Sequence, residues 1–197
     1  DDFNESTLKP EWQCQSLENS DYTIHNEKSY LEIRANSRKT DFRTPNSSPR
    51  LLQKASGKFA VEIKIGSIAD DVPWAGGIVI CRDEQNSVFF WAGIINEGDI
   101  VLQSSNSKDV FSGGIFFGRG RLISDPIYLR LERFSDKLLA YCSADGEKWF
   151  ICAETVFQFD DPIQVGIFAS GRDLLLNPTI DKINTATRFD WFRIFTK

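Results

Sequence analysis

The chain has 197 residues, of which 41% are hydrophobic and 13% aromatic, enough apolar material for the core of one large all-β domain. Its net charge is −5, and Lys and Arg are dispersed, so it lacks the basic stripe of a nucleic-acid-binding protein. It has no run of about 18 apolar residues, and we therefore predict no membrane span. The sequence contains no Met, so we expect a processed product, a domain excised from a longer protein, or a chain numbered after removal of its initiator Met.

Short runs with strand-like patterns recur along the whole chain, and clusters of turn-forming residues separate them. This arrangement is typical of a β-sandwich or barrel, and no stretch keeps a helical period over a useful length. We predict strands, in chain order, at Tyr30–Ala35, Phe59–Gly66, Gly77–Cys81, Val88–Ile95, Ile100–Ser104, Ile127–Phe134, Leu138–Ser143, Phe150–Ala153, Gln164–Ser170 and Arg188–Phe195. Because there is no internal repeat or linker, residues 1–197 are predicted to form a single domain.

Two stretches are predicted to be irregular. Asn36–Lys54 is polar and contains two prolines, and Ser170–Ala186 is a long connection before the last predicted strand. In a compact domain, loops of this length are often functional or mobile. The glycine-rich piece Gly113–Gly120 lacks the pattern of a phosphate loop and has no helix after it, so we interpret it as a turn and a short strand.

The four cysteines have no metal-type spacing. Cys142 and Cys152 flank a hairpin whose Asp145-Gly146 pair is typical of a two-residue type I′ turn. That turn would set Cys142 opposite Trp149 and Cys152 opposite Leu139, on opposite faces of the sheet, so a disulfide would need a shifted register. We therefore predict buried free thiols. They favour a reducing compartment, with a processed secreted form as the alternative.

The last predicted strand, Arg188–Phe195, places Asp190 among four aromatic residues. A carboxylate buried in such a strand without a partner would cost several kcal/mol. A hydrogen-bond network, an arginine or a metal ion should therefore satisfy Asp190.

Several short motifs occur in a characteristic order. Asp1–Trp12 resembles an opening D-D-F-N…L-D-P-x-W, with Lys where Asp is commoner, and Thr40–Arg43 resembles T-D-F/Y-W, with Arg replacing the Trp. Ser143–Trp149 is similar to a hairpin S-x-D-G-x-x-W, and Val165–Ala169 followed by Phe189–Phe192 is similar to V-G-L-F-A…F-D-x-F. Together they resemble the concanavalin A-like jelly-roll domains, which include laminin-G-like modules, family 16 glucanases and, most similar in motif, the DUF1349 family.

The resemblance implies a two-sheet antiparallel jelly roll whose first and last strands are neighbours, with one concave sheet that binds glycans in some relatives. It also implies a structural Ca²⁺ site. Asp190 and the Asp1–Asn4 region, including Asp2, would supply several of the six to eight oxygens that Ca²⁺ takes. The alternative is that Asp190 pairs with an arginine or accepts backbone hydrogen bonds from the first strand.

Family 16 glucanases carry E-x-D-x-x-E or E-x-D-x-E on one strand, which directs the catalytic carboxylates into one cleft. No predicted strand has this spacing, since Phe59–Gly66 contains only Glu62 and Ile127–Phe134 only Glu132. We therefore assign no catalytic residue, and a glycoside hydrolase is the least favoured function.

A non-catalytic sugar site needs aromatic rings that stack on sugar faces and planar polar groups that bind hydroxyls. Strand alternation allows the candidate side chains to share outward faces, and Trp91 is the preferred ring because Gly93 leaves space beside it. The predicted ligand-binding cleft consists of Trp91, Arg130, Glu132, Glu62 and Trp74. The alternative is that both tryptophans belong to the core and the charges form a solvated face.

The sequence thus predicts a non-catalytic, lectin-like module whose partner is a glycan or small saccharide. The alternative is a structural or protein-interaction domain of a larger protein. Neither nucleic acid nor membrane is a predicted partner.

Overall fold

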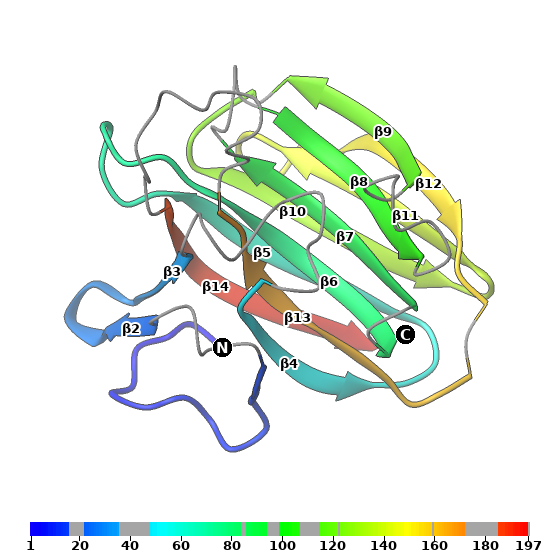
Figure 1. Cartoon of the computed structure of the whole chain (residues 1–197), viewed down its shortest axis with the longest axis horizontal. Helices are drawn as coiled ribbons and strands as arrows, with labels where there is room; N and C mark the ends of the chain where they lie inside the picture. Colours follow the sequence, from blue (N-terminus) through cyan, green and yellow to red (C-terminus); the bar gives the residue numbers. More distant parts are fainter. Residues whose placement is uncertain are drawn as a thin grey trace.

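The computed structural model describes residues 1–15, 22–35, 48–83, 86–93, 99–106, 115–121, 123–158, 160–171 and 185–196. These residues form two antiparallel β-sheets packed face to face (Figure 1). Within them, helix is limited to one short 3-10 turn, Asn26–Lys28, and no helix has the length and hydrophobicity needed to cross a membrane. The predicted all-β, two-sheet antiparallel sandwich is confirmed.

Among the described residues, each sheet has seven strands. Sheet A contains, from edge to edge, β1 (Gln13–Gln15), β4 (Arg50–Ala55), β13 (Ile163–Ala169), β6 (Ala75–Asp83), β7 (Asn86–Gly93), β8 (Asp99–Asn106) and β9 (Ile115–Arg121). Sheet B contains β12 (Phe150–Val156), β11 (Lys137–Ser143), β10 (Ile127–Phe134), β5 (Phe59–Ser67), β14 (Thr185–Thr196), β3 (Tyr30–Ala35) and β2 (Tyr22–His25). Consecutive strands therefore cross between the sheets repeatedly, as in a jelly roll.

The strands of sheet B show why this sequence forms a sandwich. On β10, Ile127, Leu129 and Leu131 are completely buried in the core between the sheets, whereas Tyr128 and Arg130 between them are only half-buried. The period of two places alternate side chains on opposite faces. One face of sheet B therefore packs into the core, and the other presents polar and aromatic groups to the outside.

Strands β6 and β7 of sheet A carry buried apolar side chains on both faces. The inner face of sheet A contributes Ile78 and Phe90 to the core, and its outer face carries a second buried apolar cluster. We call this second set the sheet A outer cluster; it consists of Leu52, Ala75, Val79, Cys81, Phe89, Trp91, Val101 and Phe168. Burial of both faces explains the nearly continuous hydrophobic runs of β6 and β7.

Strand β4 contradicts the prediction that Asn36–Lys54 is irregular throughout. Its adjacent residues Leu51 and Leu52 are both fully buried, Leu51 in the core and Leu52 in the sheet A outer cluster. A strand that is buried on both faces lacks the alternation that reveals other strands. Residues 36–47 and 172–184 of the two predicted loops, including the Thr40–Arg43 motif, lie outside the described residues.

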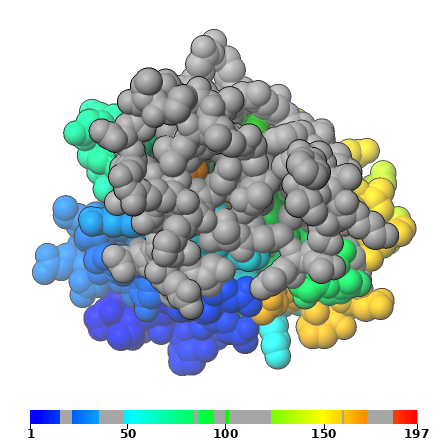
Figure 2. Space-filling model, in the orientation of Figure 1, coloured from blue at the N-terminus to red at the C-terminus, as the bar shows by residue number. Residues whose placement is uncertain are grey.

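The N-terminal segment lies against β14, as predicted. The Phe192 backbone N–H donates to the Asp1 carbonyl oxygen at 2.9 Å. The Asp1 carboxylate accepts hydrogen bonds from Trp12 Nε1 at 2.9 Å and from the Phe3 backbone at 3.0 Å, and the Trp12 ring packs on Phe192 with centroids 4.8 Å apart. Through these hydrogen bonds, Asp1 links Phe3 and Trp12 of the opening motif to the last strand. Figure 2 shows this segment, in blue, at the lower edge of the molecule.

The β11–β12 hairpin differs from the predicted type I′ turn. Its connection spans residues 144–149, Cys142 pairs with Phe150 instead of Trp149, and within the turn only Gly146 has a positive φ, of 77°. The Asp145 carboxylate accepts hydrogen bonds from the backbone N–H groups of Glu147 and Lys148, at 2.9 and 2.8 Å. A side-chain cap therefore stabilises a longer turn than the Asp-Gly pair predicted.

Candidate functional site

The outer face of sheet B brings polar and aromatic side chains together in two rows. Strand register places Tyr141, Arg130, Glu62 and Arg193 side by side across β11, β10, β5 and β14. The adjacent row consists of Ser143, Tyr128, Lys64 and Trp191 on the same four strands. We call this surface, with Glu132 and Trp149, the charged-aromatic face.

Arg130 lies at the centre of the charged-aromatic face. Its Nη1 atom donates to Glu62 Oε1 at 2.6 Å, and its Nε and Nη2 atoms both donate to Glu132, with Nε 2.8 Å from Oε1. The predicted residues Arg130, Glu132 and Glu62 are thus in direct contact. The guanidinium is held between two carboxylates, which fixes its plane and balances part of its charge.

Four aromatic rings border this network. The centroids of Tyr128 and Trp191 are 6.0 Å apart, the Arg193 guanidinium lies 4.5 Å from the centroid of Trp191, and that of Arg130 lies 5.9 Å from the centroid of Trp149. Tyr141, the fourth ring, is opposite Arg130 on β11. All four rings are half-buried, so each combines a packed edge with an accessible surface.

The hairpin turn positions Trp149 beside Arg130. Backbone hydrogen bonds from Lys148 and Glu147 hold the pKa of Asp145 down at about 2, so the capping carboxylate is charged at neutral pH. Gly146 lies on the Tyr128 ring, where an added Cβ would come within 2.9 Å of Cε1. The S-x-D-G-x-x-W motif therefore builds one wall of the charged-aromatic face.

Charges on and beside this face are balanced. The carboxylates of Glu62, Glu132, Asp190 and Asp2 are matched by the cations of Arg130, Lys64, Arg188 and Arg193, and every carboxylate is within 3.1 Å of a cation. Burial raises the pKa of the Tyr141 hydroxyl, and the nearby Glu132 carboxylate raises it further. This hydroxyl therefore stays protonated at neutral pH and can donate a hydrogen bond.

Asp190 and Asp2, the predicted calcium ligands, are both ion-paired. Asp190 Oδ1 accepts a hydrogen bond from Arg188 Nε at 2.5 Å, and Oδ2 lies 2.7 Å from Lys64 Nζ. Asp2 is 3.1 Å from Arg193. The described residues contain no group of three or more His, Cys, Asp or Glu side chains that could hold a metal. The arginine partner of Asp190 corresponds to the alternative that this carboxylate pairs with an arginine.

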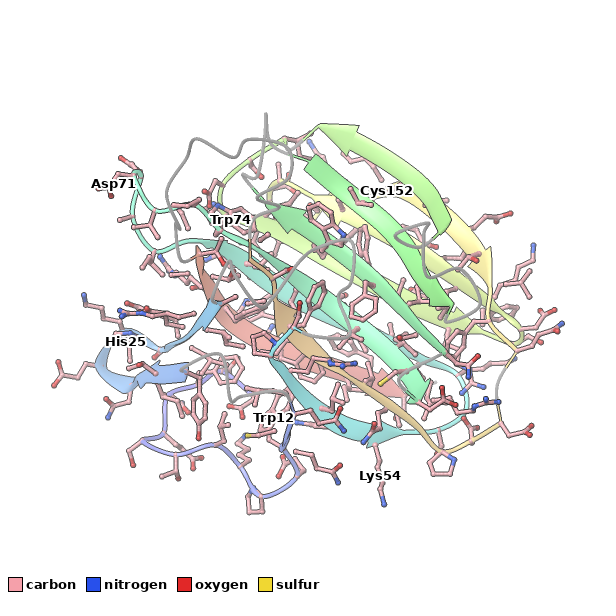
Figure 3. The ribbon with its side chains drawn as sticks, in the orientation of Figure 1. Trp12, His25, Lys54, Asp71, Trp74 and Cys152 are labelled. Carbon is pink, nitrogen blue, oxygen red and sulfur yellow. The ribbon has the colours of Figure 1, made fainter. Side chains whose placement is uncertain are left out.

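The two predicted tryptophans lie away from the charged-aromatic face. Trp91 is on β7 in sheet A, and its side chain is 3% exposed within the sheet A outer cluster. Trp74 is fully buried in the core, where its Nε1 donates to Asp125 Oδ2 at 3.0 Å (Figure 3). The expectation of one cleft containing these rings and Arg130 is therefore wrong, because β7 and β10 belong to different sheets.

Trp191 was missed as a site residue. It follows Asp190, where a β-bulge between Phe189 and Trp191 shifts the register of β14 against β5. The extra residue lets Phe189 and Phe192 both face the core while Trp191 and Arg193 face outward. The bulge is defined by the pairing of β14 with β5, so no signal in the strand's own sequence reveals it.

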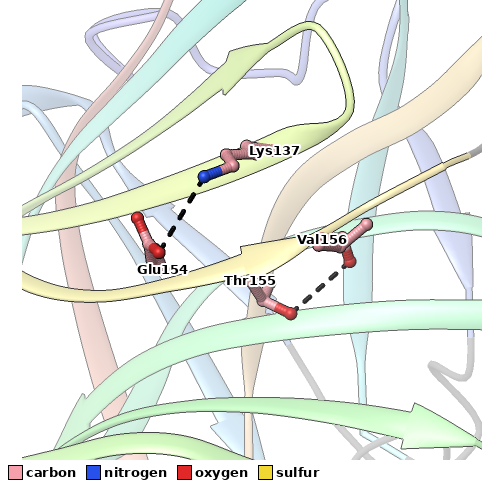
Figure 4. A pocket seen from close by; sticks show the side chains of 4 residues that line it. All are labelled: Lys137, Glu154, Thr155 and Val156. Atoms are coloured by element: carbon pink, nitrogen blue, oxygen red, sulfur yellow. Dashed lines mark hydrogen bonds and ion pairs between the residues drawn. The ribbon is translucent and has the colours of Figure 1, made fainter.

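A separate hollow of about 420 Å³ lies at the edge of sheet B (Figure 4). It is lined by Lys137, Glu154, Thr155 and Val156, with Lys137 Nζ 4.0 Å from Glu154 Oε1. None of these lining residues is aromatic, so the hollow has no ring on which a sugar could stack.

The geometry can be compared with known proteins. Residues 1–194 match the family described as "Beta xylosidase C-terminal Concanavalin A-like domain". No match was found among curated proteins.

Several solved structures have the same fold. One is the GH43 protein BlXynB of Bacillus licheniformis, with a TM-score of 0.77 and 20% sequence identity. Another is a xylan β-1,4-xylosidase of Bacillus halodurans, with a TM-score of 0.67 and 16% sequence identity. Each covers all of this chain, which spans only 39% and 38% of their lengths. A legume lectin-like domain of Entamoeba histolytica has a TM-score of 0.65 and 10% identity, covering 95% of this chain and 90% of its own.

These likenesses confirm the concanavalin A-like jelly roll predicted from the sequence motifs. Because the family match extends over nearly the whole sequence, the chain belongs to the β-xylosidase C-terminal concanavalin A-like domain family.

Proposed function

We propose that this domain is a non-catalytic carbohydrate-binding module and that the charged-aromatic face is its binding surface. The observation that carries the proposal is the grouping of four half-buried rings around the Arg130 network. Tyr and Trp rings supply apolar area for the C–H face of a sugar, and their polar edges can bind hydroxyls.

The charge balance of this face supports a neutral ligand. Arg130 and its two carboxylates present fixed donors and acceptors, as does the protonated Tyr141 hydroxyl. Paired charges leave no strong field of one sign, which a nucleic acid or polyanion would require. Sugar hydroxyls both donate and accept hydrogen bonds, and a mixed surface of this kind can satisfy both roles.

The ligand class is proposed to be xylan-type polysaccharide. This choice rests on the family and on the solved relatives, one of which is a xylan β-1,4-xylosidase. Since the chain spans about two-fifths of those relatives, we further propose that it serves a longer protein with a catalytic domain. In that arrangement the module would keep the substrate near the enzyme, which raises its effective concentration.

Isothermal titration calorimetry with xylohexaose tests the proposal. Trp149→Ala and Trp191→Ala should each weaken binding by roughly tenfold or more, corresponding to about 1.4 kcal/mol for a ring at the centre of a site. Phe195→Ala is the matched control, because Phe195 is 44% exposed and lies on the same strand as Trp191 but outside the aromatic group.

The control should bind as the unmodified chain does. Cellohexaose, titrated in parallel, shows whether the site selects xylan-type chains. Absence of heat with every oligosaccharide at millimolar concentration would refute the proposal, and so would equal loss of affinity in the Phe195→Ala control.

A specific observation favours the second function, a protein-interaction domain. Strand β12 is an edge of sheet B, and its residues Phe150, Ile151 and Val156 are 61%, 67% and 60% exposed. Exposed apolar edge strands pair readily with other chains. If this function is correct, sedimentation analysis should show association that Ile151→Lys removes, with no binding of oligosaccharide.

Two finer hypotheses stay predictions. The assignment to the DUF1349 family rests on the motifs at Ser143–Trp149 and Val165–Ala169. The other is a structural Ca²⁺ held by Asp190 and Asp2, whose carboxylates form ion pairs with Lys64 and Arg193 in this structure.

A further inference from the structure

Cys142 and Cys152 lie on adjacent strands at the edge of sheet B, in a register that differs from the sequence prediction. Tyr141 pairs with Ile151 and Ala140 with Ala153, so Cys152 is the extra residue of a β-bulge. With the two-residue turn, the thiols would point to opposite faces of the sheet and could not form a disulfide. The shifted register places both thiols on the same face. Cys142 belongs to the core cluster, and Cys152 packs against that same cluster.

Each of the two thiols shifts the pKa of the other. A hydrogen bond from Cys152 lowers the pKa of Cys142, and the same bond, together with burial, raises the pKa of Cys152. The Cys152 sulfur also lies 3.7 Å from the Phe150 carbonyl oxygen, a second acceptor for its proton. The lowered pKa favours the thiolate form of Cys142, the form that attacks a disulfide.

The pair is also accessible to a reagent. Cys142 is 6% exposed, but Cys152 is partly exposed and follows Ile151, which is 67% exposed on the edge strand (Cys152 is labelled in Figure 3). Within sheet B, β12 pairs only with β11, so local opening of this edge breaks the backbone hydrogen bonds of a single strand pair in that sheet.

We propose that Cys142 and Cys152 form a reversible disulfide that fastens the edge strand β12 to β11. The oxidant is a small-molecule disulfide of the glutathione type. One cysteine thiolate attacks it, forming a mixed disulfide and releasing one thiolate. The second cysteine then attacks the protein sulfur, forming the Cys142–Cys152 bond and releasing the other. The two protons from the cysteines end on the two released thiols, and the pair has given up two electrons.

The other two cysteines are separated from this pair. Cys14 is exposed on β1, and Cys81 is buried on β6, where burial raises its pKa to about 11. Both strands belong to sheet A. Cys81 should therefore stay a thiol, whereas the exposed Cys14 could link two molecules and complicate an experiment.

The test uses the Cys14→Ser chain, treated with oxidised glutathione and analysed by mass spectrometry and thermal unfolding. The expected product has lost two hydrogen atoms, and a peptide map contains residues 142 and 152 in one cross-linked species. Closing this short loop should raise the melting temperature by roughly 5 °C or more. Dithiothreitol should reverse both changes.

Two variants of this chain, Cys142→Ala and Cys152→Ala, are the matched controls. Each should show no rise in melting temperature and should instead carry glutathione on its remaining partner cysteine. The proposal is overturned if both cysteines of the parent chain accept glutathione without cross-linking. It is equally overturned if both stay free thiols while Cys14 of the natural sequence is oxidised. Neither result depends on whether the domain binds xylan.

Discussion

Replacing Trp74 by Ala should strongly destabilise the domain. The ring is fully buried in the core, and its Nε1 donates a hydrogen bond to Asp125 Oδ2 at 3.0 Å. Truncation of a buried Trp removes its transfer free energy and leaves a cavity, at a cost of about 3–5 kcal/mol. Domains are stabilised by only about 5–15 kcal/mol in total, so this one substitution removes a large part of the free energy of unfolding.

The more conservative Trp74→Phe separates packing from hydrogen bonding. Phe keeps an aromatic ring in the core but lacks the N–H that binds Asp125. Its cost should be about 1–2 kcal/mol, the sum of one hydrogen bond and a small void. Urea unfolding followed by far-ultraviolet circular dichroism measures both differences, since the signal reports the β-sheets and not the missing Trp.

Trp149→Ala is the matched control for this series. Trp149 is half-buried on the charged-aromatic face, so its removal should cost about 1 kcal/mol by the area it buries. Equal destabilisation by Trp74→Ala and Trp149→Ala would refute the assignment of Trp74 to the core and would restore it as a site residue.

Three further outcomes are expected. Trp91→Ala should lower the free energy of unfolding by about 3–5 kcal/mol in the same urea assay, because its ring is 3% exposed. The folded-state pKa of Asp145 lies below its ordinary value of 3.8, so the stabilisation by its carboxylate is complete above pH 3.8 and is lost as the pH falls through about 2. Hydrogen exchange of the Glu147 and Lys148 amides should rise in that pH window. In Asp145→Asn, exchange at these amides should depend less on acid. If Asp190 and Asp2 hold a structural Ca²⁺, a chelator should lower the melting temperature. If ion pairs alone hold Asp190, the chelator should leave it unchanged, and Asp190→Asn should lower stability by about 1–3 kcal/mol.

Strands with one buried and one outward face could be predicted closely. Ile127–Phe134 has the predicted bounds, because its alternation matches the two environments. Tyr30–Ala35 also has the predicted bounds, although Glu32 on its outer face is buried by its ion pairs. Arg50–Ala55 could not be found this way, since Leu51 and Leu52 are both buried and no alternation remains. The doubly buried β6 and β7 were found from continuous hydrophobic runs, whereas β4 has only a short apolar pair flanked by Arg50 and Gln53.

The candidate site was predictable only in part. Alternation correctly placed Glu62, Arg130 and Glu132 on outward faces, and pairing of β5 with β10 brings them together. It could not show that Trp91 belongs to the other sheet, because periodicity describes the faces of one strand and not the identity of its neighbours. The bulge that turns Trp191 outward depends on pairing with β5, which is equally invisible from a single strand.

The chain's five tryptophans allow one direct test of the proposed binding surface. Trp12, Trp74 and Trp91 are buried, at 7%, 0% and 3% exposure, whereas Trp149 and Trp191 lie on the charged-aromatic face. The measurement is a ¹⁵N–¹H NMR titration of the five indole N–H signals with xylohexaose. We expect the Trp149 and Trp191 signals to shift together with one dissociation constant, while the three buried indoles stay in place. Movement of Trp91 with Trp149 and Trp191 unchanged would instead locate the ligand on sheet A and contradict the account.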